Sequence, residues 1–128
     1  MTAAVLDDLC TKYTARPDEL LLVVVTIERR SLRGYPTPDC AVTMEGPGRD
    51  EFSAGTVGWF TTEYPISAPV SFLGGDARLA EAFGGGVVLA EMIHEVKARR
   101  RIGRDDGAGY GVLRYLDDAG SALAERPA

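Results

Sequence analysis

The stretch Glu19–Glu28 reads ELLLVVVTIE, a continuous apolar run enclosed by charged residues. Its β-branched residues favour an extended chain. An apolar run of this length, without alternating polar residues, is typical of a strand that is buried on both faces of a sheet. We therefore predict a buried strand here, and with it a fold that combines strands and helices.

Helices and further strands are predicted around this run. Apolar residues recur at helical spacing in Ala3–Tyr13 and, most clearly, in Val87–Arg101. The other predicted elements are a strand at Ala41–Glu45, a strand at Thr56–Tyr64 ended by Pro65, a short helix at Asp76–Phe83, and a strand or helical turn at Tyr110–Leu116. We expect a loop at Arg29–Cys40, a helix end at Gly103 and a frayed tail over residues 117–128. This order predicts an α/β two-layer sandwich that forms a single domain over residues 1–128.

The composition narrows the class of protein. The chain has 128 residues, of which 45% are hydrophobic and 26% charged, and this fits one ordinary globular domain. A net charge of -5 argues against nonspecific nucleic-acid binding, which needs a basic surface. The longest apolar run is too short to span a bilayer, and the N-terminal residues do not resemble a signal peptide. We expect a cytoplasmic protein that binds no nucleic acid and no membrane.

Metal and histidine chemistry is not predicted from the sequence. Cys10, Cys40 and His94 do not have the spacing of a metal-ligand motif. His94 lies among apolar residues of the predicted helix Val87–Arg101, where a structural or surface role outweighs that of a base. Two basic clusters stand out against the acidic composition. They comprise Arg29, Arg30 and Arg33, and then Lys97, Arg99, Arg100, Arg101 and Arg104, and solvated surface is their simpler interpretation.

Three segments carry the candidate chemistry, namely Glu45–Asp50 (EGPGRD), Thr56–Pro65 (TVGWFTTEYP) and Gly107–Leu116 (GAGYGVLRYL). Glu45 ends a predicted strand before a Gly-Pro-Gly turn. A carboxylate there can act as a general acid or base if burial raises its pKa, although a surface glutamate is the simpler interpretation. Gly58 indicates a bulge or a close backbone approach. The glycine-rich third segment is a weak phosphate-loop candidate, since no Lys-Ser/Thr follows it.

In this order, the three segments resemble signatures of the epimerization domains of nonribosomal peptide synthetases, and condensation domains carry looser versions. That family reads Glu-Gly-His-Gly-Arg-Glu, then Thr-Val-Gly-Trp-Phe-Thr followed by Tyr-Pro or Phe-Pro, then Gly-x-Gly-Tyr-Gly with Leu-Arg-Tyr-Leu. The resemblance spans Met44 to Leu116. The motif residues that it marks as lining a substrate tunnel are Gly46, Gly48, Arg49, Gly58, Trp59, Tyr64, Gly109, Tyr110 and Gly111.

The resemblance implies a fold and a reaction. The family's domain has two lobes of the chloramphenicol-acetyltransferase type, and this chain resembles the carboxyl-terminal lobe. Its substrate is an aminoacyl or peptidyl thioester on the 4'-phosphopantetheine arm of a carrier protein, so no bound cofactor is expected. Epimerization removes and returns the α-proton between two opposed bases. The resemblance assigns one of these bases, the glutamate that opens the first motif, to Glu45.

The chain also departs from the family. The His-His-x-x-x-Asp-Gly motif and the lobe that carries it are absent, and the histidine of the first motif is replaced by Pro47. Residues 20–38 and the three glycines at 84–86 resemble insertions. We therefore expect an inactive lobe, one that self-associates or requires a complementing first lobe because it exposes an apolar face.

Two alternatives stay open. One is a module that docks a carrier protein or a neighbouring synthetase domain through Arg99, Arg100, Arg101 and Arg104, whose positive charge would complement an acidic partner. The other is half of a split peptidyl epimerase, in which Glu45 would transfer the proton.

Overall fold

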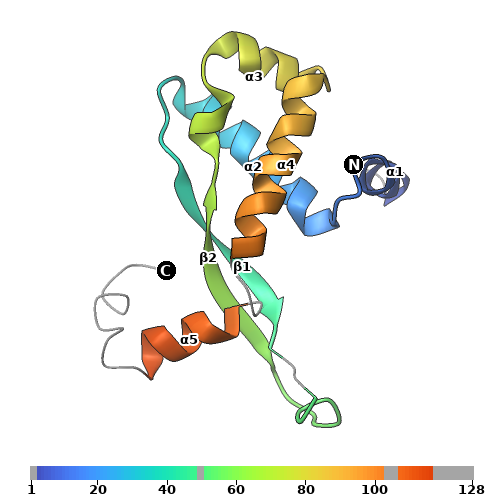
Figure 1. The fold of residues 1–128 in the computed structure, drawn as a ribbon, viewed down its shortest axis with the longest axis vertical. Helices are drawn as coiled ribbons and strands as arrows, with labels where there is room; N and C mark the ends of the chain where they lie inside the picture. Colours follow the sequence, from blue (N-terminus) through green and yellow to red (C-terminus); the bar gives the residue numbers. More distant parts are fainter. Residues whose placement is uncertain (1–2, 49–50, 103–106, 117–128) are drawn as a thin grey trace. The chain divides into compact units, whose positions relative to one another are not determined.

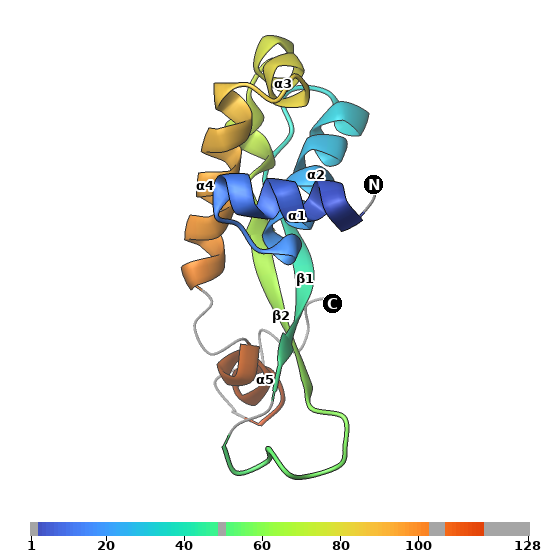
Figure 2. The same cartoon turned by 90° about the vertical axis from the view of Figure 1, so that its right-hand side faces the viewer.

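The computed structural model describes residues 3–48, 51–102 and 107–116, and these form an α/β fold of helices and one two-stranded sheet. The chain divides into two compact units (Figures 1 and 2). The helical unit combines residues 1–41 with 67–102, and the hairpin unit combines residues 42–66 with 103–128. The predicted α/β class is confirmed, whereas the predicted order of elements is wrong.

Helices α1 (Ala3–Tyr13), α2 (Pro17–Arg33), α3 (Asp76–Phe83) and α4 (Val87–Ile102), with the short 3-10 helix η1 (Val70–Leu73), make up the helical unit. Helices α2 and α4 pack side by side in Figure 1. The core consists of apolar side chains from α2, η1 and α4, of which Val70, Leu73, Met92 and Val96 are fully buried. Lys97 donates from Nζ to the backbone oxygen of Thr14 at 2.6 Å, which fixes the chain after α1 to α4.

The apolar run ELLLVVVTIE is helical, so the predicted buried strand is wrong. Pro17 is the first residue of α2, where its missing N–H costs no hydrogen bond, and Glu19 accepts a hydrogen bond from the backbone N–H of Arg16 at 2.9 Å. The buried residues of α2 recur at helical spacing, and they are Glu19, Leu20, Leu22, Val23, Thr26, Ile27 and Arg30. Residues between them, such as Leu21 and Val24, are half exposed.

Arg30 helps to hold α2 in place as a helix. The residue is 1% exposed, and it donates from Nε to the backbone oxygen of Gly74 at 2.8 Å and from Nη2 to Asp76 Oδ1 at 2.7 Å. These bonds join α2 to the turn before α3 and satisfy a charge that would otherwise be buried without a partner. The predicted loop at Arg29–Cys40 therefore begins only at Gly34, after the end of α2.

The hairpin unit contains most of strands β1 (Cys40–Pro47) and β2 (Thr61–Ala68), together with helix α5 (Ala108–Tyr115). Strand β1 confirms the predicted strand at Ala41–Glu45 and extends it. Strand β2 lies later than predicted, because Pro65 occupies an exposed position within it instead of ending it. Proline is tolerated there because β2 has β1 as its one neighbour among the described strands, and the missing N–H can face the unpaired edge.

The helices were predicted more accurately than the strands. Those at Ala3–Tyr13 and Asp76–Phe83 are confirmed with the same bounds, and the helix at Val87–Arg101 is confirmed with one further residue. For Tyr110–Leu116 we predicted a strand or a helical turn, and the segment is helical, since most of it belongs to α5. Gly103 and the tail 117–128 lie outside the described residues.

Candidate functional site

The register of the hairpin places two glutamates opposite each other. Gly48 donates its backbone N–H to the carbonyl oxygen of Phe60, and Thr62 Oγ1 donates to the carbonyl oxygen of Gly46 at 3.2 Å. The two strands have equal length, and this antiparallel register pairs Glu45 with Glu63. Both are exposed, on the face of the hairpin whose residues alternate with the buried ones.

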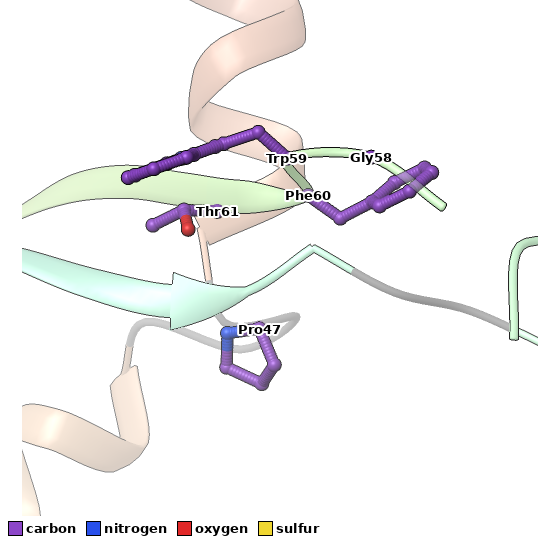
Figure 3. A pocket seen from close by; sticks show the side chains of 5 residues that line it. All are labelled: Pro47, Gly58, Trp59, Phe60 and Thr61. Atoms are coloured by element: carbon purple, nitrogen blue, oxygen red, sulfur yellow. The ribbon is translucent and has the colours of Figure 1, made fainter. Parts of the chain in front are cut away.

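A hollow of about 360 Å³ lies at the end of the hairpin, where the first two motifs meet. Its walls are Pro47 from the end of β1 and Gly58, Trp59, Phe60 and Thr61 from the approach to β2. Figure 3 shows Trp59 and Phe60 pointing in opposite directions from the start of β2. Trp59 is 88% exposed, so the described residues leave its indole uncovered. The hollow thus has an open, partly aromatic wall, and one of its residues, Pro47, follows Glu45 by two positions in the sequence.

The glycines of the first two motifs permit close backbone packing there. A Cβ at Gly48 would meet the backbone of Phe60 and would lie 3.0 Å from Thr62 Cγ2. A Cβ at Gly58 would lie 3.0 Å from Cε2 of the Phe60 ring. Both positions therefore require glycine or local rearrangement. Gly58 lies before β2, and the close neighbour there is a side-chain ring, not the backbone within a strand that was predicted.

The third motif packs on the same unit through Gly107 and Tyr64. Gly107 has φ of 88°, and a Cβ there would lie 2.9 Å from Cγ and 3.0 Å from Cβ of Tyr64. Tyr64 itself is only 4% exposed. The described residues of the three motifs are thus parts of one compact unit, although the third motif follows the second only after α3 and α4 in the sequence.

Helix α5 presents polar groups beside this contact. Arg114 Nη1 donates to the phenol oxygen of Tyr110 at 2.7 Å. This hydrogen bond, together with the negative charge of Glu63 among others, raises the pKa of Arg114 above its ordinary value. Because arginine is always protonated at neutral pH, the group acts as a fixed positive charge near the motif residues.

The described residues position most of the predicted motif residues, but not all. Arg49 and Arg104 lie outside them. Gly109 and Gly111 lie in α5, where an added Cβ would meet nothing within 4 Å, so packing does not explain why glycine occupies these two positions. Glu45 is exposed, and residues from elsewhere would have to bury it if it is to act as a base.

The arginines predicted to dock a partner are largely engaged within the helical unit. Arg99 pairs with Asp39 at 2.5 Å and with Glu95 at 2.8 Å, and Arg100 pairs with Asp18 at 2.8 Å. Arg101 is exposed, and it has no hydrogen bond or ion pair to any described residue. His94 is also exposed on α4. Docking through this cluster stays a prediction that rests mainly on Arg101.

Two kinds of feature are absent from the described residues. No group of three or more histidine, cysteine, aspartate or glutamate side chains in that part of the chain could hold a metal ion. None of the described helices is long and apolar enough to cross a membrane.

Sequence reasoning missed Glu63 as the neighbour of Glu45. Finding this neighbour requires the register of the hairpin, because the register decides which residues of two paired strands lie opposite each other. The register was not accessible, since the predicted second strand ended at Tyr64 and the observed one runs on to Ala68.

Comparison with known proteins identifies the relatives. The chain is 38% identical to vanchrobactin synthetase VabF of Vibrio anguillarum over 79% of its length. It is 34% identical to bacitracin synthase 2 of Bacillus licheniformis over 90% of its length, and 33% identical to chondramide synthase cmdD of Chondromyces crocatus over 99%. The chain is related to a segment of nonribosomal peptide synthetases.

The segment is a small part of each relative. The chain spans 3%, 4% and 3% of the lengths of these three synthetases. No protein-family profile matches the chain, and no solved structure is significantly similar to it. The predicted relationship to nonribosomal peptide synthetases is therefore confirmed at the level of the synthetase.

Proposed function

We propose that the chain is part of the carboxyl-terminal lobe of an epimerization- or condensation-type domain of a nonribosomal peptide synthetase, and that it is inactive alone. Its substrate would be an aminoacyl or peptidyl thioester on the phosphopantetheine arm of a carrier protein. Its partners would be that carrier protein and neighbouring synthetase domains. The relationship to large synthetases and the motif resemblance support this proposal.

One observation carries the proposal. The described part of the first motif, residues 45–48, and the second motif, TVGWFTTEYP, meet at one end of the β1–β2 hairpin, where Pro47, Trp59 and Phe60 line an open hollow (Figure 3). Segments that resemble successive motifs of one family thus lie together in this chain. Such a meeting supports a common role for them near one substrate.

The proposed inactivity follows from the exposure of this site. Epimerization requires a base to take the α-proton and an acid on the opposite face to return one. Between these two steps the thioester carbonyl holds the negative charge. Glu45 is exposed, and the carboxylate paired with it, Glu63, lies on the same exposed face of the hairpin, so these two groups do not stand on opposite sides of a bound substrate. A half-site of this kind forfeits the positioning on which such proton transfers depend.

The test is α-proton exchange in deuterated water on an aminoacyl carrier protein. The chain alone should give no exchange above background. Addition of a separate first lobe that carries the His-His-x-x-x-Asp-Gly motif should produce exchange. Glu45→Gln should then lower the exchange rate by about 100-fold or more, the range typical of general acid–base catalysis.

Glu63→Gln provides the matched control, because Glu63 lies opposite Glu45 on the same exposed face. This variant removes an equal charge and should retain exchange. Exchange by the chain alone would contradict the proposed inactivity. Equal losses in both variants would show that Glu45 has no special role.

A further inference from the structure

A second hollow, in the helical unit, lies between the end of α2 and the segment that leads to β1. It has a volume of about 310 Å³ and is lined by Arg29, Arg33, Pro36, Thr37, Pro38, Asp39 and Cys40. The lining is predominantly polar, unlike that of the apolar groove formed by α2, α3 and α4. Arg29 and Arg33 lie one helical turn apart on α2, so both guanidinium groups can reach a single ligand.

These two arginines differ from most others in the chain. Arg16, Arg30, Arg78, Arg99 and Arg100 all form ion pairs with carboxylates. Arg29 and Arg33 are exposed and form no hydrogen bond or ion pair with any described residue. Like charges four residues apart on a helix repel each other, and an anion held between them would relieve this repulsion. The chain carries 19 acidic residues against 14 basic ones, so a shortage of carboxylates does not explain why Arg29 and Arg33 form no ion pair with a described residue.

The residues that line the hollow after α2 are held in place. Thr37 is buried, and its hydroxyl donates to the backbone oxygen of Gly34. Asp39 accepts hydrogen bonds from the backbone N–H and the hydroxyl of Ser71, at 2.9 and 2.6 Å, and from Arg99. Because Asp39 already has these partners, its negative charge is largely offset. The hollow therefore presents two guanidinium groups that have no partner in the described part of the chain, beside residues that are held in place.

We propose that Arg29 and Arg33 form a binding site for a phosphate oxyanion. The planar guanidinium group donates two parallel hydrogen bonds, a geometry that matches phosphate. The C-terminal end of the α2 dipole weakens the attraction, but charge-assisted bonds from two arginines outweigh this partial charge. The site belongs to the helical unit and does not depend on the proposed role of Glu45.

The test uses inorganic phosphate as the probe, titrated into the whole chain at an ionic strength of about 0.01 M, where screening is weak. Nuclear magnetic resonance would follow the Nε–H signals of Arg29 and Arg33, and calorimetry would give the affinity. Saturable shifts of these two signals are expected. Arg29→Ala or Arg33→Ala should weaken binding by about tenfold or more, the value of one charge-assisted hydrogen bond.

Lys12→Ala is the control, because it removes one exposed positive charge from α1, away from the hollow. Arg33→Lys tests geometry, since it keeps the charge but loses the fork, and it should bind less tightly than the unaltered chain. Absence of saturable binding would overturn the proposal. An equal loss in Lys12→Ala would also overturn it, because binding would then reflect net charge.

The same phosphate chemistry could come from a free phosphate or from the phosphopantetheine arm of a carrier. Titration with 4'-phosphopantetheine distinguishes the two sources. Tighter binding than that of inorganic phosphate, lost in Arg33→Ala, would identify the arm as the source. Equal affinities would identify a site for free phosphate. Both results support the oxyanion site, whereas binding of phosphopantetheine that survives in Arg29→Ala and Arg33→Ala would overturn it.

Discussion

At the scale of single residues, Gly107 shows how one motif position holds the hairpin unit together. Its left-handed φ of 88° favours glycine, and a Cβ would overlap the ring of Tyr64. Gly107→Ala should lower the free energy of unfolding by about 1–3 kcal/mol through strain and forced displacement of α5. Urea denaturation, followed by circular dichroism, measures the change.

Gly109→Ala is the matched control for this prediction. Gly109 lies in α5, and an added Cβ there would meet nothing within 4 Å. Alanine favours a helix by about 0.5–1 kcal/mol over glycine, so this variant should be slightly more stable than the original chain. If both variants had the same effect, the contact between Gly107 and Tyr64 would not matter for stability.

At the scale of elements, helix α2 shows that a continuous apolar run does not by itself distinguish a helix from a strand. The eight residues from Leu20 to Ile27 contain one polar side chain, so neither a period of 2 nor one of 3.6 can be read from them. The residues that favour a helix lie before the apolar run or within it. Pro17 and Glu19 start a helix, and Thr26 donates from its hydroxyl to the backbone oxygen of Leu22 at 2.7 Å.

Adjacent leucines of α2 provide a test of this helix. Leu22 is 2% exposed and Leu21 is 52% exposed. Leu22→Ala should cost about 2–5 kcal/mol of unfolding free energy, whereas Leu21→Ala should cost less than about 1 kcal/mol. Chemical denaturation of both variants decides the matter. Comparable large losses at both positions would fit the strand buried on both faces that the sequence alone favoured.

The elements that could be predicted share a clear local signal. Val88, Met92 and Val96 of α4 recur at helical spacing, and the strand at Ala41–Glu45 ends near turn residues. The candidate site depended instead on pairing across the hairpin. The start of β2 at Thr61 and the pairing of Glu45 with Glu63 follow from register and tertiary packing, which a single sequence does not encode locally.

At the scale of the whole molecule, the chain exposes apolar surface that bears on its need for a partner. A groove of about 360 Å³ in the helical unit is lined mainly by apolar residues of α2, α3 and α4. Val24, Leu32 and Phe83 at this groove are more than half exposed. Exposed apolar patches of this kind mark interaction surfaces or promote association. Self-association, or a complementing lobe, stays a prediction that light scattering can test.

The stability of the helical unit should depend on pH through Asp39, whose partners join the segment before β1 to η1 and α4. Burial acts to raise the pKa of Asp39, but the hydrogen bonds from Ser71 and Arg99 outweigh it and lower the pKa below its ordinary 3.8. The folded state thus binds the Asp39 proton less tightly than the unfolded state does. This contribution to stability is complete above about pH 3.8 and is lost as the pH falls through the lowered value.

Asp39→Asn tests this linkage. At neutral pH it should lower the free energy of unfolding by about 1–3 kcal/mol, because hydrogen bonds to a charged acceptor are replaced by weaker ones. The difference from the unaltered chain should shrink as the pH falls below about 3.8, since the wild-type carboxylate then becomes neutral as well. Asp8→Asn removes the same charge at an exposed position of α1 and serves as the control in urea denaturation at a series of pH values. A difference that stays constant at all pH values would show that Asp39 stabilises the unit through packing and not through its charge.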